Sequence, residues 1–258
     1  MTENKIYYIY KMTDINKYFI NLSRSPSRLR SCKNEIEKHN VNNITRFEAV
    51  DGKEYCGVYG ELIYSKINTR MNYKLLRQAL INEKKLAPVL RPIKVGEIGM
   101  IQSLRKLFRQ ALDNGEEKIL VLEDDFKLCI DFNKKLEYVV KVAPQDYNIL
   151  YLGLSPLNYK YGSFQNIDSN IWQRPLGICD EEYLSKQGEC IRGSIFGCFG
   201  FIIDSHAMHC YLDQTDTMTY PCDVIFGHLA NKYNRINCYS LKNHLITYHK
   251  LGTTIHNL

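Results

Sequence analysis

Residues 118–125, Lys-Ile-Leu-Val-Leu-Glu-Asp-Asp, decide the fold. Four consecutive apolar residues predict a strand that is covered on both faces, and three carboxylates stand at its end. In an open α/β sheet, ligands bind outside the carboxyl ends of the strands. Glu123 and Asp125 are two residues apart, so on an extended chain they point to one side and Asp124 to the other. This pattern predicts that Glu123 and Asp125 hold a hard divalent cation through oxygen ligands.

The spacing of the two acids is weak evidence by itself, because two other acid pairs in the chain share it. Only Glu123 and Asp125 follow an apolar strand. In the alternative interpretation, Asp124 or Asp125 turns the chain, or caps a helix that begins near Asp131.

The composition is that of an ordinary globular protein, with 45% apolar and 24% charged residues among 258. This length suits one α/β domain over residues 1–258, with irregular insertions near 55–93 and 155–192. A net charge of +6 favours an anionic ligand. The basic residues are too dispersed for a nucleic-acid stripe, so no nucleic-acid partner is expected.

The nine cysteines form no Cys-x-x-Cys pair, which argues against a zinc ribbon or a thioredoxin-like site. The first residues lack the pattern of a signal peptide, and no apolar run approaches the roughly 18 residues of a membrane helix. We therefore expect a cytoplasmic protein without a transmembrane segment. The sequence does not indicate an oligomeric state.

A strand, helix, strand unit opens the predicted fold. Residues 18–22 are typical of a strand, Ser25-Pro26 of a helix start, and 44–50 of a second strand that turns at Asp51-Gly52. Right-handed crossovers bring the carboxyl ends of such strands to one edge, so Asn21 and Asp51 should lie there. Further helices are predicted over 71–85, 97–112, 131–141, 204–213 and 223–233, and further strands over 148–152, 194–203 and 236–241.

Five segments in this order resemble glycosyltransferase family 25, which includes lipopolysaccharide galactosyltransferases and procollagen galactosyltransferase-like enzymes. The segments are Ile20-Asn21-Leu22-Ser23-Arg24 with Arg28, residues 47–52 ending in Val-Asp-Gly, Gly96-Glu97-Ile98-Gly99, residues 121–125, and Tyr220-Pro221-Cys222-Asp223. The stretch 197–207 is similar to the family's glycine-rich strand. The resemblance spans residue 18 to about residue 253 and omits 55–93 and 155–192.

The resemblance implies a GT-A type fold, a single Rossmann-like α/β domain whose central, mostly parallel sheet is flanked by helices. It also implies inverting, metal-dependent transfer of a hexose, galactose or glucose, from a UDP-sugar to a hydroxyl acceptor. The acceptor would be a glycan or the hydroxylysine of a collagen-like protein, and the cofactor Mn²⁺ or Mg²⁺.

The resemblance also assigns residues to the donor site. Asn21, Leu22, Arg24 and Arg28 fall in its nucleotide-binding segment, and Glu123, Asp124 and Asp125 in its metal and diphosphate motif. We add Asp51 to the donor-binding residues, and expect Asp124 to contact the ribose or the reacting sugar. Arg24 and Arg28 could face the diphosphate, although exposed helix arginines are the alternative.

Inversion requires a carboxylate that takes the proton of the acceptor hydroxyl. Asp223 is the candidate base, and its alternative role is to cap a helix. Six of the seven histidines lie beyond residue 200. Among them His249 is the candidate third metal ligand, because GT-A enzymes often complete the metal shell from a C-terminal segment.

The chain departs from the family pattern after Gly99. Met100 stands where the family usually has Cys, and Ser103-Leu104 where it has Ser-His. A non-catalytic module that binds a sugar nucleotide or a glycan on the same scaffold therefore stays open as a second hypothesis.

Residues 118–125 also resemble the first strand of bacterial receiver domains. That class needs an Asp at the end of a later strand, and residues 147–153 supply none. Phosphatases of the haloacid dehalogenase type need a nucleophilic Asp where Glu123 stands. We reject both.

Overall fold

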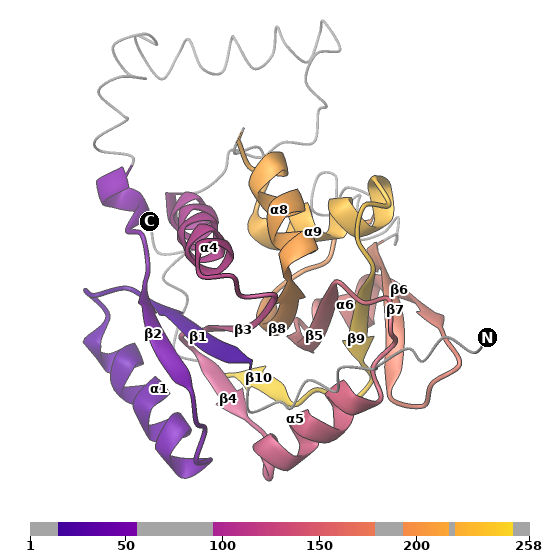
Figure 1. The fold of residues 1–258 in the computed structure, drawn as a ribbon, viewed down its shortest axis with the longest axis horizontal. Coiled ribbons are helices and arrows are strands. Elements are labelled where there is room, and N and C mark those ends of the chain that lie inside the picture. The colour runs from indigo at the N-terminus through magenta and orange to yellow at the C-terminus, as the bar shows by residue number, and fades with distance from the viewer. Residues whose placement is uncertain (1–14, 56–94, 179–192, 217–219, 250–258) are drawn as a thin grey trace, which may run out of the picture.

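The computed structural model describes residues 15–55, 95–178, 193–216 and 220–249. Eight strands of this part form one sheet in the order β2-β1-β3-β8-β5-β9-β7-β6, and two more, β4 and β10, form a small second sheet (Figure 1). The strands are β1 (Asn16–Asn21), β2 (Ile44–Glu48), β3 (Lys118–Glu123), β4 (Phe126–Leu128), β5 (Ile149–Leu154), β6 (Gly162–Asn166), β7 (Trp172–Ile178), β8 (Cys198–Asp204), β9 (Cys238–Leu241) and β10 (Ile246–Tyr248).

The sheet is mixed, but its central strands mostly run in one direction. β1 pairs in parallel with β2 and β3, and β5 in parallel with β9. β8 lies antiparallel between β3 and β5, which leaves those two strands pointing the same way. The carboxyl ends of β1, β2, β3, β5 and β9 therefore meet at one edge. The predicted mostly parallel sheet flanked by helices is confirmed.

Helices cover both faces of the sheet: α4, α8 and α9 lie on one side, and α1 and α5 on the other (Figure 1). The helices are α1 (Pro26–Lys38), α4 (Val95–Asp113), α5 (Phe132–Lys141), α6 (Leu157–Tyr161), α8 (Ser205–Gln214) and α9 (Cys222–Gly227), which continues as a π-helix, η2 (His228–Lys232).

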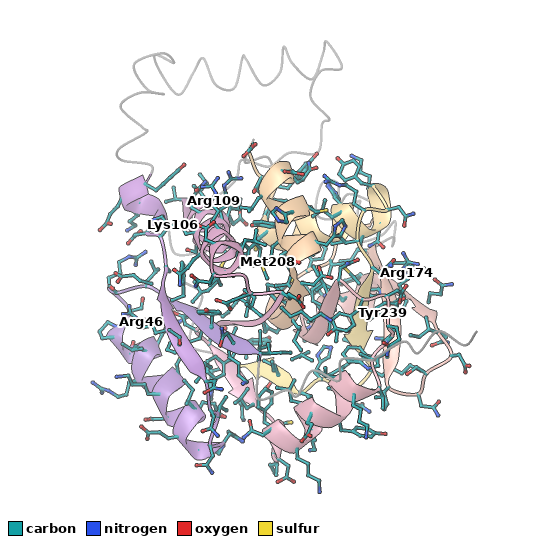
Figure 2. All side chains as sticks on the ribbon, in the orientation of Figure 1. Arg46, Lys106, Arg109, Arg174, Met208 and Tyr239 are labelled. Atoms are coloured by element: carbon teal, nitrogen blue, oxygen red, sulfur yellow. The ribbon has the colours of Figure 1, made fainter. Side chains whose placement is uncertain are left out.

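The side chains of β3 point alternately to the two faces of the sheet, and each face has its own hydrophobic core. Ile119 and Val121 pack toward α4 and α8, while Leu120 and Leu122 pack toward α5, and all four are at most 1% exposed. Each such side chain stabilises the fold by about 1.5–3 kcal/mol. Met208 of α8 is fully buried in the first core (Figure 2). The apolar run therefore forms the doubly covered strand that its sequence predicted.

The first predicted unit is confirmed as β1, α1 and β2. Pro26 occupies the first turn of α1, but the side chain of Ser25 makes no capping hydrogen bond. The predicted helix over 97–112 is found as α4, and that over 223–233 as α9 with η2. The predicted helix over 71–85 lies outside the described residues.

The expectation of irregular structure over 155–192 is wrong for residues 157–178, which form α6, β6 and β7. Pro175 and two glycines obscure the alternation there, and the β6–β7 register shifts between Ser163 and Phe164. The hairpin is anchored by Trp172, which is fully buried and donates its indole N–H to the carbonyl oxygen of Val139 at 3.1 Å.

Candidate active site

A cleft opens at the carboxyl ends of β1, β2 and β3. It holds about 700 Å³ of empty space, part of it open to solvent. Of the predicted site residues, those that line it are Leu22, Arg24, Arg28, Asp51, Glu123, Asp124 and Asp125. Asn21 lies beside it, hydrogen-bonded to Asp124. The sheet thus brings together side chains that are about 100 residues apart in the chain.

One wall of the cleft is the Val50-Asp51-Gly52 turn, which is pressed against the start of α4. A Cβ atom added to Gly52 would lie 1.9 Å from the carbonyl oxygen of Val95. A Cβ atom added to Gly99 would lie 2.8 Å from the carbonyl oxygen of Val50. Ser103 joins the two segments, because its hydroxyl accepts from Val50 N at 2.8 Å and donates to Gly99 O at 2.7 Å. Our sequence analysis missed this role of Ser103. The two glycines of the Gly-Glu-Ile-Gly motif are the signal in the sequence that another segment packs closely against this helix.

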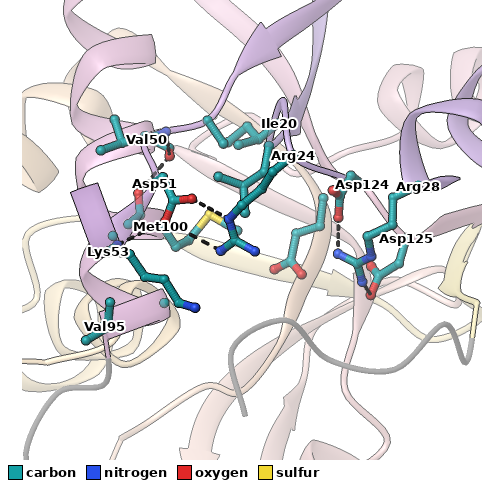
Figure 3. Close-up of a pocket in the computed structure, with 17 residues that line it drawn as sticks. Ile20, Arg24, Arg28, Val50, Asp51, Lys53, Val95, Met100, Asp124 and Asp125 are labelled. Atoms are coloured by element: carbon teal, nitrogen blue, oxygen red, sulfur yellow. Dashed lines mark hydrogen bonds and ion pairs between the residues drawn. The ribbon is translucent and has the colours of Figure 1, made fainter. Parts of the chain in front are cut away.

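Arg24 and Asp51 form an ion pair on this wall (Figure 3). Lys53 N also donates to Asp51 Oδ1 at 2.9 Å. The hydrogen bond from Arg24 is the main reason why the pKa of Asp51 lies below its ordinary value. Asp51 is therefore held as an ionised hydrogen-bond acceptor at the rim of the cleft.

The opposite wall is the acidic turn, Glu123-Asp124-Asp125, and Arg28 of α1 clamps it. One terminal nitrogen of Arg28 contacts Asp124 Oδ1, and the other contacts Asp125 Oδ2 at 2.9 Å (Figure 3). Asn21 Nδ2 donates to Asp124 Oδ2 at 2.8 Å. The expectation that Asp124 faces away from Asp125 is wrong. β3 ends at Glu123, so strand alternation does not continue through the two-residue turn to β4.

Negative charge accumulates in the acidic turn. Burial raises the pKa of Glu123 well above its ordinary value, and the charges of Asp125, Asp223 and Asp124 raise it further, while Arg28 opposes them. Burial likewise raises the pKa of Asp125, against the effect of Arg28. Like charges concentrated in this way are stabilised by a bound cation.

The donor atoms present suit a hard cation. Asp125 Oδ1 is buried and has no hydrogen-bond partner in the described part of the chain. Carboxylate oxygens are the ligands that Mn²⁺ and Mg²⁺ prefer. Within residues 15–55, 95–178, 193–216 and 220–249, however, no three side chains of His, Cys, Asp or Glu are grouped so that they could hold a metal. Glu123 and Asp125 are therefore suitable ligands for the cation, but they form only part of the ligand set that it needs.

β10 pairs with β4 and brings His249 to the acidic turn, where its backbone N–H donates to Asp125 O at 2.7 Å. Its ring lies close enough to Asp125 for its charge to lower the pKa of that carboxyl, and it also approaches a second acid. His249 Nε2 lies 3.9 Å from Glu35 Oε2, and Glu35 Oε1 lies 3.3 Å from His39 Nε2. Glu35 is only 6% exposed, so a buried carboxylate lies beside both rings.

Asp223 stands in the first turn of α9, where Pro221 takes the capping position. Its Oδ2 accepts from Gly197 N at 2.8 Å, and its Oδ1 accepts from Val224 N at 2.9 Å. Burial raises the pKa of Asp223, and the charge of Glu97 adds to this effect. Because Asp223 also raises the pKa of Glu123, the two carboxylates belong to one electrostatic cluster. Sequence analysis did not identify Glu97 as part of this cluster.

The two departures from the family pattern have different surroundings. Met100 lines the cleft, whereas Leu104 is 2% exposed and packs in the core between α4 and the sheet. An imidazole at position 104 would point into that core in this structure.

The model of the family described as glycosyltransferase family 25 (LPS biosynthesis protein) matches residues 14–226. The match includes the cleft, the acidic turn and Asp223, and ends before His249. Human procollagen galactosyltransferase 2 is 27% identical over 146 residues, which are 55% of this chain. The matched part is only 21% of that relative's length.

Solved structures give distant likenesses of fold alone. The apo structure of the bifunctional glycosyltransferase WbbM has a TM-score of 0.41 and 12% identity, over 86% of this chain and 38% of that one. An apo UDP-glucose pyrophosphorylase has a TM-score of 0.44 and 8% identity, over 89% and 91%. No helix among the described residues has the length and apolar character needed to cross a membrane.

Proposed function

Because this chain belongs to glycosyltransferase family 25, we propose that it transfers a hexose from a UDP-sugar to a hydroxyl acceptor with inversion of configuration. The hexose would be galactose or glucose, and the cofactor Mn²⁺ or Mg²⁺. The observation on which the proposal depends is one cleft that joins the Asp51 turn to the acidic turn. Such a cleft offers an anion-binding arginine, a hydrogen-bond acceptor and cation ligands to one extended ligand.

In this proposal the nucleotide lies between the end of β1 and the Asp51 turn. Asp51 is kept ionised by Arg24, so it can accept hydrogen bonds from ribose hydroxyls. Leu22 lines the cleft and supplies apolar surface for the base. Asn21 fixes Asp124, which is 7% exposed, and thereby fixes the acidic turn next to the donor.

Glu123 and Asp125 would hold the cation, with His249 as a further candidate once its ring leaves Glu35. A bound divalent cation neutralises the diphosphate oxygens as the glycosidic bond breaks. Asp125 Oδ1, which is buried and has no hydrogen-bond partner among the described residues, would gain one from such a cation.

Asp223 is the proposed base. Burial raises its pKa, and a carboxylate whose pKa lies nearer neutrality is a better proton acceptor than an ordinary aspartate. Its hydrogen bonds from Gly197 N and Val224 N fix the carboxylate while it takes the acceptor's proton. Asp124, bound to Arg28 and Asn21, is assigned a contact with the ribose or the reacting sugar.

The acceptor class is drawn from the relatives. The partial similarity to procollagen galactosyltransferase 2 supports a collagen-like acceptor, and the family's description as LPS biosynthesis protein supports a glycan. The alternative is a non-catalytic sugar-nucleotide or glycan-binding module, which Met100 in the cleft and Leu104 in the core keep open.

A donor screen tests the proposal. The full chain is incubated with UDP-galactose, UDP-glucose and their N-acetylated counterparts, with and without Mn²⁺, and released UDP is quantified. We expect Mn²⁺-dependent release from one of the two hexose donors, and a product of inverted anomeric configuration by NMR. Tight UDP-sugar binding without release or transfer under any condition would instead support the binding module.

A further inference from the structure

Arg28 already occupies the place next to the acidic turn where positive charge is needed. Its two terminal nitrogens contact two different carboxylates, those of Asp124 and Asp125. All three side chains are largely buried, with exposed fractions of 12%, 9% and 18%. A guanidinium that bridges two partly buried carboxylates forms strong, charge-assisted hydrogen bonds.

This bridge from Arg28 to Asp124 and Asp125, called the clamp below, hinders the approach of a cation to Asp125. One oxygen of Asp125 is bound to Arg28, and only Oδ1 is left without a hydrogen-bond partner among the described residues. A dication at this carboxylate would also lie close to the positive charge of Arg28. Charges of like sign a few ångströms apart repel strongly where water is largely excluded. While Arg28 is bound to it, the acidic turn is therefore a poor cation site, in agreement with the absence of a group of three metal ligands from the described part of the chain.

The partner that could draw Arg28 away is a diphosphate. Arg28 lines the same cleft as Asp51 and the acidic turn, and a planar guanidinium binds phosphate oxygens as well as it binds carboxylates. Asp124 would keep the hydrogen bond from Asn21 during such an exchange. Arg46 in turn donates to Asn21 Oδ1 at 3.1 Å and fixes its orientation.

We propose that Arg28 is a positioning residue that holds the acidic turn in place of the cation and releases Asp125 when a nucleoside diphosphate takes its guanidinium. The inference rests on the proposed function and adds an order of binding, in which the diphosphate prepares the site for the cation. Cation affinity is low in the free protein and rises when the diphosphate binds. By linkage, the cation raises diphosphate affinity by the same factor.

The test measures Mn²⁺ binding to the full chain by electron paramagnetic resonance, without nucleotide and then with saturating UDP. Without nucleotide, Arg28→Gln should bind Mn²⁺ about tenfold or more tightly than the wild type, and the gain on adding UDP should shrink. Arg30→Gln is the matched control. It removes the same charge two positions along α1 from an exposed side chain, and should change affinity by less than about twofold.

Arg28→Lys guards against misfolding of the glutamine variant, because it keeps the charge but cannot bridge both carboxylates in the same way. It should show an intermediate Mn²⁺ affinity, and circular dichroism on each variant verifies the fold.

Nucleotide-free Mn²⁺ affinity that is unchanged or weaker in both folded Arg28 variants overturns the inference. The donor screen separates this failure from that of the function itself. A wild type that releases UDP although Arg28 has no effect on Mn²⁺ affinity is a glycosyltransferase without the clamp exchange. An absence of release together with tighter Mn²⁺ binding by Arg28→Gln keeps the clamp and removes the proposed activity.

Discussion

Gly52→Ala should separate the Asp51 turn from α4 and thereby distort the cleft. The added Cβ would lie 1.9 Å from Val95 O, whereas ordinary contacts begin near 3.4 Å, so the two segments must move apart by about 1.5 Å (3.4 − 1.9). The opposing atoms belong to the backbone and cannot rotate away. We expect the free energy of unfolding to fall by about 1–3 kcal/mol, the usual cost of overpacking.

The same displacement moves Asp51, the neighbour of Gly52 in the turn. A misplacement of about 1 Å can lower turnover by roughly 100-fold, so activity should fall far more than stability alone explains. Urea unfolding measures the loss of stability, the rate of UDP release measures turnover, and calorimetric titration measures UDP affinity.

Gly115→Ala is the control for this variant. Gly115 has a φ of +73° with nothing within 4 Å of an added Cβ, and it lies at the end of α4 remote from the cleft. It should lose about 1 kcal/mol of stability and keep wild-type UDP affinity. Wild-type UDP affinity and turnover in Gly52→Ala would refute the packing argument.

Three further outcomes are expected. Asp223→Asn should lower turnover by about 10²–10⁴-fold while UDP-sugar affinity stays within about threefold, measured by steady-state kinetics and titration; a loss of thermal stability alone would leave Asp223 a structural residue. Leu104→His, which restores the residue usual in the family, should destabilise the fold by about 2 kcal/mol or more without raising turnover, because position 104 is 2% exposed in an apolar core. Burial lowers the pKa of His228 from 6.5 to about 4. Above pH 6.5 this imidazole is neutral in both the folded and the unfolded protein. Between pH 6.5 and 4 only the unfolded protein binds the proton readily, which favours unfolding. Stability should therefore fall by up to about 3 kcal/mol between pH 6.5 and 4, and urea unfolding of His228→Phe should show a shallower decline over this window.

The sequence was sufficient for the elements that follow simple periodicity. The apolar run before Glu123 forms β3, and the Ser-Pro start and Val-Asp-Gly end of the first unit place Asn21 and Asp51 as predicted. Periodicity failed over 157–178, because Pro175 sits at an irregular pairing and the hairpin owes its place to buried Trp172. Parallel and antiparallel strands also look alike in sequence, so the position of β8 between β3 and β5 was not foreseen.

The candidate site was predictable in its residue types more than in their contacts. Sequence indicated that Arg28 and the acidic turn belong to one site, but the bridge across 96 and 97 residues exists only once α1 has packed beside β4. His249 reaches the turn through the β4–β10 pairing, while its ring contacts Glu35, a residue without any motif. Non-local contacts of this kind follow from packing, which local patterns do not encode.

We propose above all that Asp125 holds a divalent cation against the diphosphate of the donor. The most direct measurement is Mn²⁺-dependent UDP release by Asp125→Asn beside the wild type, with circular dichroism to verify an intact fold. We predict that the variant loses Mn²⁺-dependent release and that its Mn²⁺ affinity in the presence of UDP falls by about tenfold or more. Wild-type release with undiminished Mn²⁺ dependence in a correctly folded Asp125→Asn variant would contradict the claim.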